Sequence, residues 1–190
     1  MGIKVLKFGG SSLASAEQFR KVAAIVKAEP ERRYVVASAP GKRSGDDTKV
    51  TDMLYGCFRL ANEKKSIDEA FSLIEERYNS IIRELGLDMD LSEEYEKIRL
   101  AISHHAGADY VASRGEYLNS MILAKYLDFP FVDAEYGVFF KEDGRFDDAR
   151  TYAALGSLLK DKAYAVVPGF YGSMPNGTIR TFSRGGSDIT

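Results

Sequence analysis

The sequence has little cysteine: Cys57 is the only one among 190 residues. A single cysteine excludes an intramolecular disulfide, and the absence of a disulfide framework is consistent with a reducing compartment. Cys57 falls on the apolar stripe of a predicted helix, so we expect a buried and unreactive thiol.

Excess charge of one sign and long apolar runs are also missing. Lys and Arg total 26 against 28 Asp and Glu, a net charge of -2, which gives no reason to expect a nucleic-acid surface or an anionic membrane partner. No stretch approaches the length of a membrane span, and the first strand-like run begins at Ile3, which leaves no room for a signal peptide. We therefore expect a cytoplasmic protein.

Two common nucleotide-binding motifs are absent as well. The sequence contains neither G-x-x-x-x-G-K-[ST] nor G-x-G-x-x-G, which weighs against a P-loop and against a dinucleotide-binding fingerprint. It also lacks an internal repeat, a low-complexity tract and a linker. With 45% hydrophobic residues, its length favours one globular domain.

Strand-like and helix-like apolar patterns alternate along the chain. Strand-like runs occur at 3–8, 33–39, 129–134, 163–168 and 178–182. Helical stripes fill most of the intervals, with a block of them at 50–61, 67–85, 91–102 and 118–125. This alternation predicts an α/β fold with a mainly parallel sheet covered by helices.

The first strand-like run leads into a glycine-rich turn, Lys7-Phe8-Gly9-Gly10-Ser11-Ser12, and an amphipathic stretch over 19–26 follows. The glycines let the backbone approach an anion, and the next helix would direct its free N–H groups toward it. Lys7 can supply the charge that a transferring phosphoryl group needs. Ser15 and Gln18 have capping-box spacing. The alternative is a tight turn beside a solvated lysine.

A second cluster is Arg114-Gly115-Glu116, at an expected loop-to-helix transition. The helix dipole favours an acid in a first turn whether or not the acid binds anything, and Glu116 could alternatively receive the ammonium group of an amino acid. The charged segment 42–48 is either a solvated turn or a mobile edge over an active site. Thr51, just beyond it, is a candidate hydroxyl contact at a helix start.

A third cluster is Arg184-Gly185-Gly186-Ser187-Asp188. Arginine is suited to grip a carboxylate with two parallel hydrogen bonds, and Asp188 could orient reacting groups or help to hold a metal–nucleotide complex. The plain alternative is a surface Arg–Asp pair. His104 and His105 are adjacent and lack neighbouring ligand residues, so we expect no metal site of the protein's own.

Together, the segments 7–12, 113–116, 168–172 and 181–188 resemble the N-terminal part of the kinase domain of the aspartokinases. The resemblance implies the amino-acid kinase fold, an α/β/α sandwich around a mainly parallel sheet. It implies phosphorylation of the side-chain carboxylate of L-aspartate by ATP with Mg²⁺, giving 4-phospho-L-aspartate for the biosynthesis of lysine, threonine and methionine. It also suggests a homo-oligomer in the full-length enzyme.

The resemblance implies roles for the residues of these motifs. Lys7 would stabilise the transferring phosphoryl group, and Asp188 would organise the lysines and the metal–phosphate geometry. Glu116 would receive the substrate ammonium and Arg184 would grip its α-carboxylate. The remaining substrate contacts would be Thr51 and Ser187, and the phosphate site would be lined by Gly9, Gly10, Ser11, Gly185 and Gly186.

The resemblance further implies that residues 1–190 are the N-terminal portion of a kinase domain. The segment that supplies most of the adenine pocket and the regulatory ACT domains would then be missing, and we expect little activity from these residues alone. One alternative is another amino-acid kinase, such as an acetylglutamate kinase, whose substrate has no free ammonium for Glu116. Another is a non-catalytic binding or assembly module with the same fold.

Overall fold

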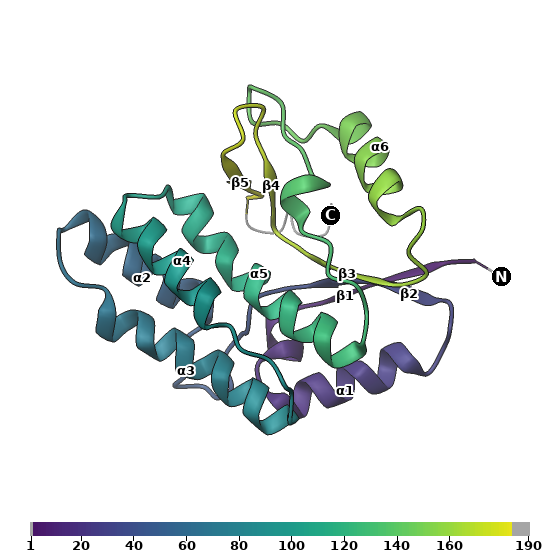
Figure 1. The fold of residues 1–190 in the computed structure, drawn as a ribbon, viewed down its shortest axis with the longest axis horizontal. Helices are drawn as coiled ribbons and strands as arrows, with labels where there is room; N and C mark the ends of the chain where they lie inside the picture. The colour runs from purple at the N-terminus through teal and green to yellow at the C-terminus, as the bar shows by residue number, and fades with distance from the viewer. Residues whose placement is uncertain (1, 184–190) are drawn as a thin grey trace.

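A parallel sheet lies at the centre of the computed structural model, which describes residues 2–183 (Figure 1). Its strands are β1 (Lys4–Phe8), β2 (Arg32–Ala37) and β3 (Ala165–Pro168), in the order β1-β2-β3. All pairings in this sheet are parallel. The strands predicted at 3–8, 33–39 and 163–168 are therefore confirmed.

Helices connect the strands. They are α1 (Ala16–Lys27), α2 (Val50–Asn62), α3 (Asp68–Leu85), α4 (Ser92–Ser103), α5 (Ala108–Leu127) and α6 (Asp148–Leu159), with 3₁₀ turns η1 (Gly10–Leu13) and η2 (Ala134–Tyr136). Ser15 caps α1 and accepts a hydrogen bond from the Gln18 backbone N–H at 3.5 Å, so the predicted helix start is confirmed. Four helices in succession, α2 to α5, form the predicted helical block.

The sheet has a different cover on each face. Val35, Ala37 and Val166 point into the larger core, which α1 to α5 complete. Ala165 and Val167, on the alternate face, pack with residues of η2, of α6 and of a small hairpin. Figure 1 shows α1 on one side of the sheet and α6 with the hairpin on the other. This is the predicted α/β/α arrangement.

Two of the predicted strands differ in the structure. The run at 129–134 forms only a single parallel bridge, between Phe131 and Val166, because Pro130 has no N–H to extend the ladder. The run at 178–182 contains β5 (Ile179–Thr181), which pairs antiparallel with β4 (Tyr171–Ser173) in a separate sheet.

The position of Glu116 also differs from the prediction. Gly115 suggested a helix boundary, but α5 begins at Ala108 and runs through it, so the expected loop-to-helix transition is wrong. A Cβ at Gly115 would lie 2.8 Å from the Ala39 Cβ, and the missing side chain lets α5 pack closely against the segment after β2. The acid in the first turn is Asp109, and the helix dipole therefore does not explain Glu116.

Cys57 is fully buried on α2, as expected, and burial raises the pKa of its thiol to about 11. A protonated thiol without solvent access is a poor nucleophile. We expect no reaction of the native protein with an aromatic disulfide reagent at pH 8 and release of one equivalent of chromophore after denaturation. Rapid labelling of the native protein would contradict this burial.

Candidate functional site

A cleft of about 450 Å³ opens at the carboxyl ends of β1 and β2, where ligands bind in open α/β sheets. Its walls come from the start of η1, the connection that follows β2, the first turn of α2 and the middle of α5. The lining residues are Gly10, Ser11, Ser38, Ala39, Pro40, Gly41, Lys42, Lys49, Thr51 and Glu116. Four predicted site residues, Gly10, Ser11, Thr51 and Glu116, thus meet in one place.

Close backbone contact shapes one wall of the cleft. The Gly41 N–H donates a hydrogen bond to the Gly10 carbonyl at 2.8 Å. A Cβ at Gly41 would lie 2.7 Å from the Gly10 carbonyl carbon, and one at Gly10 would lie 2.9 Å from the Ala39 oxygen. Neither position has room for a side chain, so the two glycines bring the turn after β1 against the connection after β2.

Glu116 is the buried carboxylate of the cleft, with 6% of its surface exposed. Burial raises its pKa from 4.5 to about 7, and the Ala39 backbone N–H and the charge of Arg114 oppose that rise. Within residues 2–183, the Oε2 atom has no hydrogen-bond partner. A buried carboxylate oxygen without a donor is suited to receive a cationic group of a ligand.

Contacts of α5 fix where Glu116 lies. The Tyr78 hydroxyl of α3 donates to the Gly115 carbonyl at 2.8 Å, and the Asn119 side-chain amide donates to the Ser38 carbonyl at 2.7 Å. One face of α5 is therefore held between α3 and the segment after β2. This places the Glu116 carboxylate against the Ala39 backbone, inside the cleft.

The helix that begins at the cleft is α2. Lys49 is its N-cap residue and Thr51 lies in its first turn, as predicted for a helix start. The glycine pair does not lead directly into a helix: Gly10 begins the turn η1, and α1 starts beyond it at Ala16, which is not among the residues that line the cleft. The start of η1 and the start of α2 line the cleft instead.

Two cations of the cleft, Lys42 and Lys49, were not among the predicted site residues. The available signal was their position in the connection that follows a strand of a parallel sheet. Conversely, Lys7 lies in β1 opposite Val36, with Gly9 directly after the strand, and neither is among the residues that line the cleft. The predicted residues Arg184, Gly185, Gly186, Ser187 and Asp188 lie outside the described residues.

Arg114 does not line the cleft although it precedes Gly115. Its guanidinium carbon lies 4.6 Å from the ring centre of Tyr110, 4.5 Å from that of Tyr117 and 5.3 Å from that of Tyr171. It also donates two hydrogen bonds to the Ser113 hydroxyl. Arg114 therefore joins α5 to β4 through aromatic contacts.

Other kinds of site receive no support from the part of the chain that the structure describes. Within it, no His, Cys, Asp and Glu side chains gather in a group of three or more that could hold a metal ion. Both predicted surface histidines, His104 and His105, are exposed. No helix between residues 2 and 183 has the length and apolar character needed to span a membrane.

Comparison with known proteins agrees with this architecture. The model of the amino acid kinase family matches residues 2–190. The chain is 37% identical to aspartokinase 3 of Bacillus subtilis, over 99% of its own length and 44% of that protein. It superimposes on the aspartate kinase of Clostridium acetobutylicum with a TM-score of 0.96 and 47% identity, covering 100% of this chain and 44% of that one.

The aspartokinase III of Escherichia coli, solved in complex with aspartate and ADP, gives a TM-score of 0.78 at 25% identity, over 99% of this chain and 45% of that one. The chain thus spans less than half the length of each of these relatives. The resemblance to the aspartokinases and the amino-acid kinase fold expected from the motifs are confirmed. The chain belongs to the amino acid kinase family.

Proposed function

We propose that the protein acts as an aspartokinase, transferring the γ-phosphoryl group of ATP to the side-chain carboxylate of L-aspartate. The observation that carries the proposal is the buried Glu116 carboxylate, which has one oxygen without a hydrogen-bond partner within residues 2–183 and lies in a cleft that also contains two lysines. The similar E. coli aspartokinase III has been solved with aspartate and ADP. Glu116 gives such a substrate a partner for its ammonium group.

The aspartate would lie between α2 and α5. Glu116 would accept hydrogen bonds from the ammonium group of the aspartate. The Thr51 hydroxyl, at the start of α2, would contact the aspartate from the facing wall. Arg184 would bind the α-carboxylate and Ser187 would add a contact, both roles resting on the family motif. The ammonium group and the α-carboxylate would then bind to separate side chains.

The phosphates would lie at the glycine turn. Backbone groups of Gly9, Gly10 and Ser11, with Gly185 and Gly186, would surround them, and Lys7 would stabilise the transferring group. Lys42 and Lys49 join this proposal because they line the same cleft. Mg²⁺ usually keeps several waters and binds through the nucleotide phosphates, so it would arrive with ATP, with Asp188 organising the geometry.

The proposed reaction requires the protein mainly to position the reactants and to neutralise charge. The side-chain carboxylate of aspartate has a pKa near 4 and is ionised at neutral pH, so no general base is needed to activate it. Holding the nucleophile in line with the phosphoryl group and neutralising the developing charge are sufficient. The domain assignment, the homo-oligomer and the cytoplasmic location stay predictions.

Calorimetric titration tests the substrate. We expect L-aspartate to bind and N-acetyl-L-aspartate, which keeps both carboxylates but has a neutral acetylated amide in place of the ammonium, to bind at least about 100-fold more weakly. Leaving a buried carboxylate unpaired costs about 3–5 kcal/mol, and 100-fold corresponds to about 2.7 kcal/mol.

N-acetyl-L-glutamate is the comparison ligand. If it bound more tightly than L-aspartate, the aspartokinase proposal would be replaced by an acetylglutamate kinase. Binding of no amino acid and no nucleotide by the folded protein would favour the non-catalytic module. ATP turnover with aspartate, measured on the same preparation, separates binding from catalysis.

A further inference from the structure

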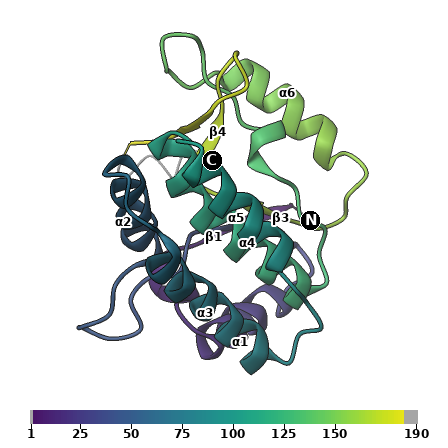
Figure 2. The same ribbon diagram turned by 60° about the vertical axis from the view of Figure 1, so that its left-hand side comes forward.

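The connection between β2 and α2 forms one wall of the cleft and is held almost entirely by polar contacts. Figure 2 shows this segment projecting from the body of the fold. Gly41 is buried, but from Lys42 to Lys49 every residue is exposed except Asp47, which is intermediate. Burial of apolar side chains therefore contributes little to the position of residues 42–49.

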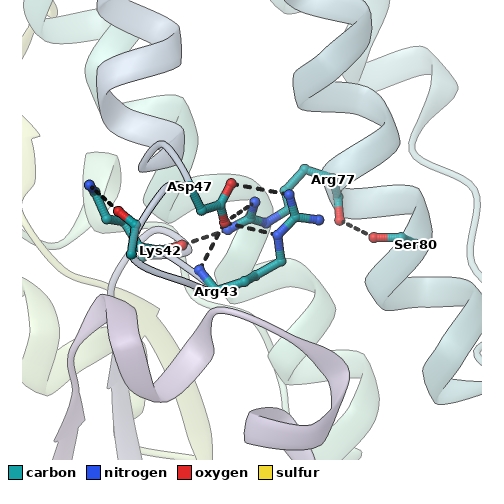
Figure 3. Close-up of polar contacts among 7 residues, drawn as sticks. Lys42, Arg43, Asp47, Arg77 and Ser80 are labelled. Atoms are coloured by element: carbon teal, nitrogen blue, oxygen red, sulfur yellow. Dashed lines mark hydrogen bonds and ion pairs between the residues drawn. The ribbon is translucent and has the colours of Figure 1, made fainter.

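One buried cation reaches this segment from another helix. Arg77 of α3 keeps only 3% of its side chain exposed, and its Nη1 lies 2.8 Å from the Asp47 carboxylate. Its Nη2 donates to the Gly41 carbonyl at 2.6 Å. Figure 3 shows the guanidinium pointing from α3 to Asp47. A single side chain thus holds both ends of the segment.

The carboxylate of Asp47 has a second partner, Arg43, whose backbone N–H and Nε both donate to it, at 2.8 and 2.9 Å. The side-chain bond from Arg43 holds the pKa of Asp47 well below its usual range, with Arg77 adding to the effect. Arg43 belongs to the same segment and is half exposed, so it shapes the turn internally. Among the described residues, Arg77 is the side-chain partner of Asp47 that belongs to another element, and it connects the turn to α3.

The segment separates two hollows. Lys42 and Lys49 line the cleft on one side, while Arg43, Asp47 and Arg77 line a groove of about 390 Å³ on the other. A wall with open space on both sides has few packing contacts to resist displacement. Its position then depends on the hydrogen bonds of Arg77 and on the contact between Gly41 and Gly10.

We propose that Arg77 is a positioning residue that holds residues 41–49 against the glycine turn and thereby keeps Lys42 and Lys49 at the phosphate end of the cleft. This deepens the proposed function and rests on it for the identity of the ligand. Arg77 lines the outer groove and not the cleft. It acts on the nucleotide only through the segment that it binds.

Hydrogen exchange tests the holding of the segment without reference to any ligand. In the full chain carrying Arg77→Met, we expect the amides of residues 42–49 to exchange at least about tenfold faster than in the parent. Asp47→Ala should accelerate the exchange at least as much, because it removes the bonds from Arg43 as well as the bond from Arg77. The effect of the double variant should be smaller than the sum of the two single effects, because the two residues share one bond. Arg77→Lys, which keeps the cation, should restore part of the protection.

Arg83→Met is the matched control, because Arg83 lies on the same helix and its ion pair with Glu76 is exposed. It should leave the exchange of 42–49 unchanged. Equal exchange in the parent and in Arg77→Met, with both folded by circular dichroism, would overturn the proposal. So would an equal acceleration in Arg83→Met.

Binding then tests the consequence for the site. In Arg77→Met, the affinity for ATP with Mg²⁺ should fall about tenfold, while the affinity for L-aspartate changes less than twofold, because Glu116 lies on α5. Fast exchange with unaltered ATP affinity would overturn the link to the lysines. If the parent binds neither ligand, the proposed function fails, and the exchange experiment still decides whether Arg77 holds the segment.

Discussion

Replacing Glu116 by glutamine should weaken the binding of L-aspartate at pH 8 by about 100-fold or more. The amide has nearly the shape of the carboxylate but lacks the charge that makes a hydrogen bond to an ammonium strong. Losing one partner of a buried charge pair costs about 3–5 kcal/mol, and every 1.4 kcal/mol is tenfold in affinity. Isothermal titration of both proteins measures the difference.

The parent should also show a pH dependence that the variant lacks. Burial raises the pKa of Glu116 to about 7, so the free protein carries a proton there at pH 6, and the ammonium requires the ionised form. We expect the affinity to rise about tenfold per pH unit between pH 5 and 6 and to level off above about pH 8. Titrations in buffers of different ionisation enthalpy should report proton release in the parent only.

The stability of the free protein should depend on the ionisation of Glu116 in the opposite sense to the affinity for L-aspartate. Because the pKa of Glu116 in the folded protein lies above its ordinary value of 4.5, the contribution of Glu116 to stability is fully present below pH 4.5 and is lost as pH rises through about 7. The full loss is about 3 kcal/mol. Without ligand, Glu116→Gln should therefore resist urea better than the parent at pH 8, and the difference should shrink at pH 5.

An exposed glutamate supplies the control. Glu96 lies on the solvent side of α4, and Glu96→Gln should leave both the affinity and the stability profile as in the parent. An aspartate affinity that is the same in Glu116→Gln and in the parent would remove Glu116 from the proposed substrate site. A parent affinity without pH dependence would show that its carboxyl is ionised throughout.

The parts of the fold that could be predicted are those that depend on short-range sequence patterns. The apolar run of β1, the Gly9-Gly10 pair and the Ser15 cap lie within a few residues of each other, and each has a local physical cause. The alternation of strand-like and helix-like patterns likewise predicted the parallel sheet. These features do not depend on which distant segment packs against them.

The position of Glu116 could not be derived in the same way. The family resemblance identified the residue, but Gly115 suggested a helix boundary where α5 in fact continues. The reason for that glycine is Ala39, which belongs to a segment far away in the sequence. A close approach between distant segments leaves a small residue in the sequence and no sign of its partner.

The two lysines of the cleft were not predicted, although a general rule would have been enough to predict them. Lys42 and Lys49 follow β2, and the rule that ligands bind at the carboxyl ends of parallel strands would have been enough to include them. Arg77 could not be found by that rule, because its partners Gly41 and Asp47 belong to a different part of the chain. On α3 it has the spacing of an ordinary core-facing residue, between Ile74 and Tyr78.

Replacing Gly41 by alanine should have the second large effect, a loss of at least about 100-fold in affinity for ATP with Mg²⁺. The added Cβ would lie 2.7 Å from the Gly10 carbonyl carbon and 2.8 Å from the Ser11 nitrogen. Both of these neighbours are backbone atoms, which cannot rotate out of the way as a side chain could. The segment that contains residue 41 must therefore move away from the glycine turn. That displacement would break the hydrogen bond from Gly41 to Gly10 and shift the Arg77 contact.

The cost in stability should be smaller than the cost in binding. Inserting a methyl group into a tight contact typically destabilises by about 1–3 kcal/mol, which a globular domain of this size survives. Thermal unfolding and nucleotide titration of the same variant separate the two effects. A folded Gly41→Ala protein with the ATP affinity of the parent would mean that the phosphates do not bind at this turn.

Gly45→Ala is the matched control, because it adds the same methyl group to the same connection. Nothing lies within 4 Å of a Cβ at Gly45, so binding and stability should stay close to those of the parent. If both variants lost ATP affinity equally, the cause would be the general flexibility of residues 42–49. A loss confined to Gly41→Ala would instead locate the phosphates where the two glycine-containing segments meet, because the added methyl group meets the glycine turn at Gly41 and open space at Gly45.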